Sequence, residues 1–305
     1  MNQTAHSDET DAGGLWVPLT ERRVLRVAGD EARGFLQNLV TCDLDDVDSD
    51  GAGYGALLTP QGKILFDFLI FAKDGAYLLD SHSSIAADLA KRLGFYKLRA
   101  KVEIADASDS WRVIATWGDV APTGVSGIAL PDPRLASFGH RVLAETGTGE
   151  APRPSGFRES DEGAYHARRV AFALPEAPHD FQFGDAFPHD ADMDDLHGVA
   201  FDKGCFVGQE VVSRMQHRGT ARRRIVRVKA DAPLPAPGSA VTAGGKAAGT
   251  LGTTDGAAGL AMVRLDRVEG ARTRGEPILA GDVCIEAHLP AWATFVWPAT
   301  AGGDA

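Results

Sequence analysis

Hydrophobic residues change their spacing repeatedly along the first hundred positions, and each change predicts a new element. A short alternating run over residues 22–29 is typical of a strand. A helix is predicted to begin at Asp30, because the next apolar side chains recur at helical spacing: Phe35, Leu36, Leu39 and Val40. Two apolar runs, residues 54–58 and 64–71, then flank the turn segment 59–63 and predict a β-hairpin.

The alternation continues after this hairpin. A strand is predicted at residues 76–79, followed by a helix that Ser83 is expected to cap. The apolar face of that helix carries Ile85, Leu89 and Leu93. Further strands are predicted at residues 102–105 and 113–116. A mixture of helices, strands and hairpins of this kind favours an α+β fold over a doubly wound parallel sheet.

The second half of the chain is more irregular. Residues 118–157 are rich in proline and glycine, so we expect a loop with one short strand near residues 141–144. A helix near residues 164–170 precedes an irregular acidic stretch, 175–195. From about residue 221, short strands alternate with Gly/Pro turns and show little helical periodicity, which predicts a small β-barrel or sandwich. These strands are expected at residues 224–228, 261–265 and 283–287.

Composition narrows the class of protein. The chain has 305 residues, 44% of them hydrophobic, and its net charge of −11 argues against broad nucleic-acid binding. No apolar run reaches about 18 residues, and the polar N-terminus has no signal-peptide pattern. The cysteines Cys42, Cys205 and Cys284 form no CxxC pair. We therefore expect a reducing, cytoplasmic setting and no metal held by these cysteines alone.

The segment from Asp202 to Glu210 concentrates the candidate chemistry of the chain. Cys205 stands between two glycines, Gly204 and Gly208, and Lys203 precedes it. A helix beginning at Gly208 would point free N–H groups toward the thiol, and both this helix and the lysine would lower the pKa of the thiol. A free cysteine is often only a small buried hydrophobe. The flanking lysine and glycines favour a functional thiol instead.

Two charged runs flank this segment. Histidines and acids crowd into residues 179–197 at spacings that match no standard metal motif, so we expect a solvated acidic loop. A basic run follows, from Arg214 to Lys229. Its residues 222–224 could bind an anionic tail or RNA phosphates, or could form a solvated face at a domain junction.

The cysteine segment resembles the signature of the YgfZ family, K-G-C-[YF]-x-G-Q-E followed by an arginine and G-x-x-[RK]-[RK]. Here it reads KGCFVGQE, and Phe206 stands where many relatives have tyrosine. The remaining matching positions are Gly204, Gly208, Gln209, Arg214, Gly219, Arg222 and Arg223. The mitochondrial branch of this family assists iron–sulfur cluster assembly, so the resemblance implies iron–sulfur assembly proteins and their client enzymes as partners.

The N-terminal half is similar to the glycine-cleavage T-protein, a folate-dependent aminomethyltransferase, in RVAGDEARGFLQNLVTCDL and LLTPQGKILFDFLIF. This similarity implies a ring-like fold around a tetrahydrofolate channel, and three segments: a disordered tail (1–14), a folate-binding region of two subdomains (15–220) and a β-barrel (221–300). The T-protein carries paired aspartates in its hairpin. This chain has Phe66-Asp67 there, which weakens the assignment as an aminomethyltransferase.

The leading hypothesis is a tetrahydrofolate-binding accessory factor for the assembly or repair of iron–sulfur proteins. The resemblance implies reactive roles for Cys205 and Lys203. The residues expected at folate are Asp67, Glu210, Arg222 and Arg223. The alternatives are a folate-dependent one-carbon transferase and a tRNA-modification factor. The acidic net charge makes nucleic acid the weakest direct partner.

Overall fold

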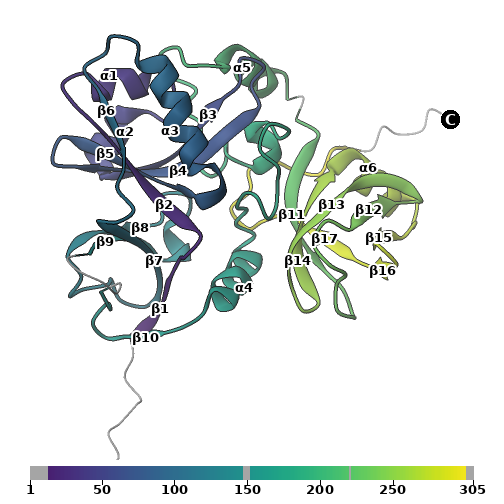
Figure 1. Cartoon of the computed structure of the whole chain (residues 1–305). Helices are drawn as coiled ribbons and strands as arrows, with labels where there is room; N and C mark the ends of the chain where they lie inside the picture. Colours follow the sequence, from purple (N-terminus) through teal and green to yellow (C-terminus); the bar gives the residue numbers. More distant parts are fainter. Residues whose placement is uncertain (1–12, 147–151, 220, 300–305) are drawn as a thin grey trace, which may run out of the picture.

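Three β-sheets organise the protein in a computed structural model that describes residues 13–146, 152–219 and 221–299 (Figure 1). Two five-stranded sheets and their helices form one lobe, and a seven-stranded, nearly closed barrel forms the other. Residues 1–12 of the predicted tail lie outside the described residues. Gly14, which the prediction also placed in the tail, begins the first strand.

The first sheet is antiparallel, with strand order β3-β4-β5-β2-β6. Its strands are β2 (Arg22–Ala28), β3 (Ala52–Leu58), β4 (Ile64–Lys73), β5 (Ala76–His82) and β6 (Glu103–Asp106). Three helices cover one face: α1 (Ala32–Gln37), α2 (Leu44–Asp50) and α3 (Ser83–Lys97). Their buried side chains, such as Leu36, Val47 and Leu89, pack with alternate residues of the sheet.

The alternation along β4 decides which side chains reach the centre of the lobe. Phe66, Phe68 and Ile70 pack under the three helices. Leu69 belongs to the core on the opposite face, and Asp67 lies two residues before it on the same strand. The sheet therefore directs the carboxyl group of Asp67 toward the middle of the molecule, where it is buried.

The second sheet has the order β10-β1-β7-β9-β8, with one parallel pair, β1 and β10. Its strands are β1 (Gly14–Pro18), β7 (Trp111–Gly118), β8 (Gly127–Pro131), β9 (His140–Glu145) and β10 (Phe157–Glu159). The short helix η1 (Ala136–Phe138) lies between β8 and β9, and α4 (Glu162–Phe172) follows β10. This sheet lies below the first in Figure 1.

The barrel has the strand order β16-β15-β12-β13-β14-β11-β17. Its elements are β11 (Arg223–Lys229), β12 (Ala240–Ala243), β13 (Lys246–Asp255), β14 (Ala258–Arg264), α6 (Leu265–Thr273), β15 (Ile278–Ala280), β16 (Val283–Cys284) and β17 (Glu286–His288). Small and branched apolar residues fill its interior, among them Val226, Val263 and Ile285.

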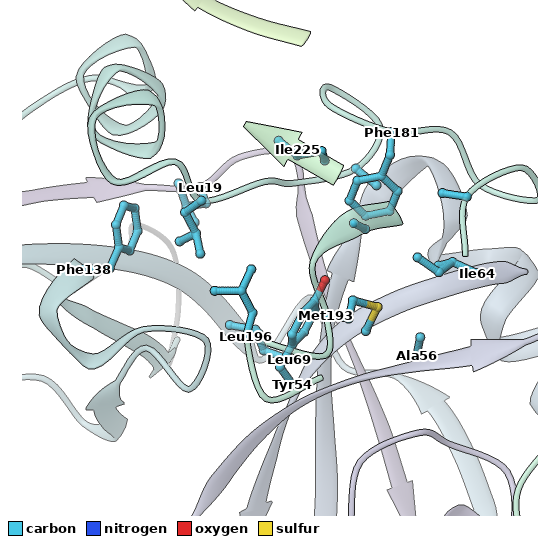
Figure 2. Packing of buried hydrophobic residues seen from close by; sticks show 14 of the residues in the cluster. Leu19, Tyr54, Ala56, Ile64, Leu69, Phe138, Phe181, Met193, Leu196 and Ile225 are labelled. Carbon is cyan, nitrogen blue, oxygen red and sulfur yellow. The ribbon is translucent and has the colours of Figure 1, made fainter. Parts of the chain in front are cut away.

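One hydrophobic cluster joins all three sheets (Figure 2). It combines Tyr54 and Leu69 of the first sheet with Val113 of the second and Ile225 of the barrel. The irregular segment before the cysteine motif supplies further members, such as Met193, and contains the short helix η2 (Pro188–Ala191). The lobes share a core, because barrel residues contribute directly to the central cluster.

Most predicted elements are present, including the hairpin of β3 and β4 and the buried face of α3. Several details differ. The helix predicted from Asp30 is shorter, because Leu39 and Val40 leave it and Val40 forms a β-bridge with Leu57. His82, not Ser83, caps α3.

Several elements were missed. The acidic stretch before Gly51 is a helix, α2, capped by the Asp43 carboxylate. The segment predicted as a loop with one strand contains β8 and β10 in addition to β9. The barrel also carries α6, although little helical periodicity was expected there.

Candidate functional site

A buried lysine attaches the cysteine segment to the first sheet. The Lys203 ammonium donates to the carbonyl oxygens of Val40 (2.9 Å) and Cys42 (2.6 Å), and its Nζ lies 5.5 Å from the centre of the Phe206 ring. Burial lowers the pKa of Lys203, although Cys42 and Asp43 oppose this effect. The described hydrogen bonds thus direct the ammonium to backbone oxygens and not to the Cys205 thiol. Lys203 positions the segment, and a reactive role for it stays a prediction.

The chain around residues 40–42 is held from a second direction. Thr41 donates through its hydroxyl to the carbonyl of Gly198 (2.6 Å), and the N–H of Ala200 donates to the carbonyl of Thr41 (2.9 Å). On the sheet side, the N–H of Thr41 donates to the carbonyl of Ala56 (2.9 Å). The approach to the cysteine is therefore bonded to the same short piece of chain as strand β3.

Cys205 and Gly204 are exposed at the surface, while Lys203 and Phe206 on either side of them are buried. Phe206 is 7% exposed, and Lys203 is 8% exposed. Gly208 caps helix α5 (Gln209–Arg218) with φ +80°, and a Cβ there would lie 2.5 Å from the carbonyl oxygen of Thr59 in the β3–β4 turn. Only glycine fits that conformation and approach. The thiol is thus presented to solvent by a loop that is anchored on both sides.

The rest of the motif faces outward. Glu210 is exposed in the first turn of α5 and pairs with Arg214 one turn later. In the part of the chain that the structure describes, no hydrogen bond or ion pair joins Glu210 to Asp67. Glu210 is thus exposed whereas Asp67 is buried, and a shared folate site for the two residues stays a prediction.

A surface cavity of about 610 Å³ is lined in part by Cys42 and Ala200, which belong to the segments that hold this loop in place. Its wall includes Cys42, Tyr54, Arg134, His197, Val199 and Ala200, so the chain that holds Lys203 also lines the cavity. The rim is acidic, with exposed Asp46 and Asp50 and half-buried Asp43, and the buried Asp132 also lines the cavity. A ligand entering here meets negative charge at the mouth and aromatic and guanidinium groups on the wall.

Asp67 lies behind this wall. The Tyr54 hydroxyl, which belongs to a residue lining the cavity, donates to Asp67 Oδ2 at 3.2 Å. Asp67 Oδ1 is buried and has no hydrogen-bond partner among the described residues. Burial raises the pKa of Asp67 to about 6, Glu176 adds to this rise, and Arg22 and Arg134 oppose it. The carboxyl group can therefore exchange a proton near neutral pH.

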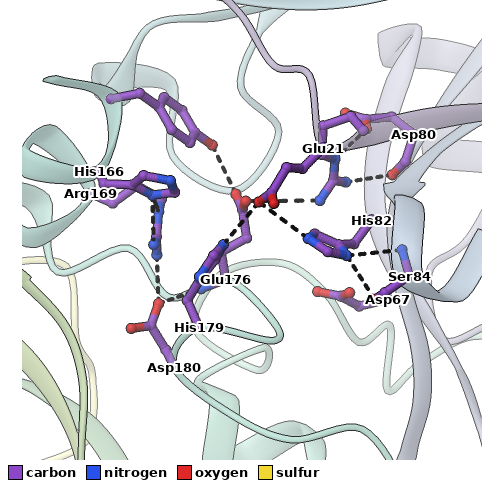
Figure 3. A network of polar contacts seen from close by, with 12 residues as sticks. Glu21, Asp67, Asp80, His82, Ser84, His166, Arg169, Glu176, His179 and Asp180 are labelled. Atoms are coloured by element: carbon purple, nitrogen blue, oxygen red, sulfur yellow. Dashed lines mark hydrogen bonds and ion pairs between the residues drawn. The ribbon is translucent and has the colours of Figure 1, made fainter. Parts of the chain in front are cut away.

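A buried network of ion pairs surrounds Asp67 (Figure 3). Arg22 binds Asp80 at 2.6 Å, and Arg134 binds Asp132 at 2.8 Å and Glu176 at 3.5 Å. Burial alone would raise the pKa of Glu176, but neighbouring arginines lower it well below its usual value. The network fixes charged groups in the centre of the fold, where mutual pairing compensates their lost hydration.

The sequence did not identify this network, although it identified Asp67. Its other members are Arg22, Tyr54, Asp80, Asp132, Arg134, Arg141, Tyr165, Arg169, Glu176 and Asp180. They come from separate elements and stand in no short motif. A signal was present in one place, where polar residues interrupt the strand sequence of β5 at Asp80.

The two charged runs bind each other, which corrects the prediction that the acidic loop is solvated. Asp190 and Asp192 are buried. Arg224 makes a bidentate contact with Asp194 (2.5 and 2.7 Å), and Arg223 binds Asp190 (2.6 Å). Acids from the first lobe thus neutralise bases from the barrel. Of the residues 222–224 considered for anion binding, only Arg222 is exposed.

Comparison with known proteins identifies the family. Human and mouse iron–sulfur cluster assembly factor IBA57, mitochondrial, are 31% and 32% identical to this chain. The alignments cover 94% and 93% of this chain and 87% and 85% of the relatives. The chain belongs to the IBA57 family. The predicted membership of the YgfZ family is thereby confirmed. The C-terminal β-barrel domain of CAF17 matches residues 222–295.

Other relatives of the IBA57 family are longer. The mitochondrial IBA57 homologue of Neurospora crassa is 32% identical over 240 residues, and this chain spans only 54% of its length. These relatives are named as mitochondrial proteins, so the expectation of a cytoplasmic setting is wrong. Among the helices that the structure describes, none combines the length and hydrophobicity needed to cross a lipid bilayer.

A solved structure shows the same fold. The glycine cleavage system aminomethyltransferase T from Bartonella henselae superimposes with a TM-score of 0.70, at 14% identity. The match covers 93% of this chain and 87% of that protein. The predicted α+β fold of the T-protein type, with a C-terminal barrel, is confirmed.

Proposed function

We propose that this protein is an accessory factor in the assembly or repair of iron–sulfur proteins, and that Cys205 is its contact with a cluster-carrying partner. The single observation behind this proposal is an exposed thiol on an anchored loop. Its relatives are named iron–sulfur cluster assembly factors. Thiolates are the usual protein ligands of iron–sulfur clusters.

The geometry favours a shared cluster over one held by this chain alone. Of the other two cysteines, Cys42 is buried, and burial raises the pKa of its thiol to about 12. Cys284 is exposed but belongs to strand β16 of the barrel. Because a cluster needs several thiolates or imidazoles, the missing ligands must come from a partner protein.

Replacement of Cys205 tests this proposal. In cells lacking the gene, a Cys205→Ser variant is expected to leave [4Fe–4S] enzyme activities at the level of the deletion, because the hydroxyl is a poor cluster ligand. Cys284→Ser is the matched control, since it removes the other exposed thiol, and it is expected to restore full activity. Full restoration by Cys205→Ser, with both variants expressed equally, would rule out the proposal.

Folate is the proposed small-molecule ligand, in the cavity that Cys42 and Tyr54 line. A volume of about 610 Å³ lies within the range of ligand pockets. Tyr54 on the wall supplies a hydroxyl oxygen that can accept an N–H of a pterin, and Asp67 behind it accepts the hydroxyl hydrogen and orients that oxygen. The acidic rim opposes a glutamate tail, so only the pterin end is expected to enter from this side.

Calorimetric titration with tetrahydrofolate separates folate binding from the role of the thiol. The wild type is expected to bind, and Asp67→Asn is expected to bind at least about tenfold more weakly, because the carboxylate that orients the Tyr54 hydroxyl is lost. The exposed acid Asp88 on α3 provides the control, Asp88→Asn. Absence of heat with the wild type would exclude folate and leave the Cys205 proposal standing.

A further inference from the structure

A second group of chemically reactive side chains, Glu21, His82 and His179, lies within the polar network of Figure 3. Glu21 stands just before strand β2, and His82 ends strand β5. Antiparallel pairing sets Arg22 opposite His82, and the N–H of Ser83 donates to the carbonyl of Glu21 (2.7 Å). His179 reaches the same point from the irregular segment after α4.

The distances between these three side chains are informative. Glu21 Oε2 lies 3.5 Å from His82 Nε2 and 3.7 Å from His179 Nε2, and all three donor atoms lie within 4.8 Å of one another. Both distances exceed the 2.7–3.2 Å of an ordinary N–H···O hydrogen bond. Two ligands at about 2.0–2.1 Å from one tetrahedral metal ion are separated by about 3.3 Å. The spacing therefore fits a shared metal ion better than direct hydrogen bonds.

Among the three side chains, His82 is the one that the fold buries and holds in place. It is 7% exposed, and its Nε2 is buried without a hydrogen-bond partner in the described part of the chain. Its Nδ1 lies 2.8 Å from Ser84 Oγ and accepts the N–H of Ser84 at 3.1 Å. When Nε2 binds a metal, Nδ1 carries the proton and can donate it to the hydroxyl, although the cap contact to the N–H is then lost.

The surroundings of the three side chains leave a path for a cation to enter and place few unpaired positive charges nearby. His179, whose side chain is 34% exposed, lines a surface cavity of about 580 Å³ together with His166 and residues 253–255. The nearby guanidinium groups are already neutralised, Arg22 by Asp80 and Arg169 by Asp180. A carboxylate, Glu162, lies at the edge of the cleft that contains Glu21 and His179. A divalent cation would therefore meet unpaired negative charge.

We propose that Glu21, His82 and His179 form a binding site for a divalent first-row transition metal ion of the Zn²⁺ or Fe²⁺ type. Two imidazoles and one carboxylate suit these ions, whereas Mg²⁺ and Ca²⁺ prefer ligand sets made of oxygen. Three protein ligands leave one position for water or substrate, as in catalytic metal sites. This site goes beyond the proposed function and does not depend on it.

Titration with Zn²⁺ tests the site in full-length protein carrying Cys205→Ser and Cys284→Ser, so that exposed thiols do not compete. We expect one Zn²⁺ per chain by calorimetry, together with a rise in the melting temperature, and no such response to Mg²⁺. Glu21→Gln and His179→Gln change partly exposed side chains and are each expected to weaken binding at least about tenfold.

His288→Gln is the matched control, because His288 also faces one carboxylate, Glu286, at 3.5 Å but lacks a second imidazole ligand. This variant is expected to bind as the parent does. Visible absorption of bound Co²⁺ reports the coordination in each folded variant. Absence of Zn²⁺ and Co²⁺ binding, or binding unchanged by both Glu21→Gln and His179→Gln, would overturn the proposal and leave the role of Cys205 untouched.

Discussion

Burial governs the acid–base behaviour of Asp67, the residue in the centre of the fold that the sequence singled out. One oxygen accepts from Tyr54 and the other has no partner in the part of the chain that the structure describes, so the ionised form gains little from hydrogen bonds. Removal from water dominates, and the pKa rises from 3.8 to about 6. A carboxyl group with a raised pKa binds its proton more tightly in the folded chain than in the unfolded chain.

This residue is therefore expected to destabilise the fold as pH rises. The resulting decrease in the free energy of unfolding is absent below about pH 4 and grows as the pH rises toward 6. Above pH 6 it is fully present and reaches about 3 kcal/mol for a pKa shift of this size. Urea unfolding of the wild type and Asp67→Asn between pH 4 and pH 7 measures it. The stability of the wild type relative to the variant should fall across this window.

The control for that experiment is Asp88→Asn, which removes one negative charge at an exposed position of α3. Subtracting its effect leaves the contribution of burial. If the difference between the wild type and Asp67→Asn is constant from pH 4 to pH 7, the carboxyl group does not have the raised pKa that its environment implies.

At the scale of elements, the sequence predicted those that bury a long, regular apolar pattern. Strands β3 and β4 are such elements, and so is α3, whose Ile85, Leu89 and Leu93 are all buried. Two of the missed elements, β8 and α2, bury little. Strand β8 has no fully buried residue, and α2 contains only two, Leu44 and Val47. The sequence signal for α2 was Asp43 at the cap position followed by acidic residues in the first turn, a pattern that is common at the beginning of helices.

In the candidate site, features that are local in sequence could likewise be predicted, whereas contacts between distant residues could not. The motif around Cys205 could be recognised because its chemistry is local in sequence, including the glycine that the approach to Thr59 requires. The direction of the Lys203 side chain could not be predicted, because its partners Val40 and Cys42 lie about 160 positions away in the sequence. A charge in a sequence does not name its partner, so the buried Lys203 was expected to have a reactive role and the half-buried Arg223 was expected at folate.

At the scale of the whole molecule, the contact between the acidic loop and the barrel joins the two lobes. Arg224 is buried and bonds to Asp194, to the carbonyl of His189 (2.9 Å) and, more loosely, to Asp192 (3.6 Å). One guanidinium group thus compensates two buried carboxylates. Burial raises the pKa of Asp192 well above its ordinary value, an effect that Arg224 limits.

Loss of the arginine should therefore cost more than loss of one acid. Arg224→Met leaves Asp192 and Asp194 buried together and is expected to lower the free energy of unfolding by about 3–5 kcal/mol. Asp194→Asn leaves Arg224 beside Asp192 and is expected to cost about 1–3 kcal/mol. Urea unfolding followed by circular dichroism and by tryptophan fluorescence measures both, and we expect the two probes to give one transition because the lobes share a core.

Arg222→Met is the matched control, because it removes the exposed neighbour of the same basic run. A surface substitution of this kind should change stability by less than about 0.5 kcal/mol. If Arg224→Met is as mild as Arg222→Met, the junction does not depend on the buried pair. If it instead unfolds the barrel in a separate step, the shared core around Ile225 is not sufficient to couple the lobes, and Arg224 is the residue that makes them one cooperative unit.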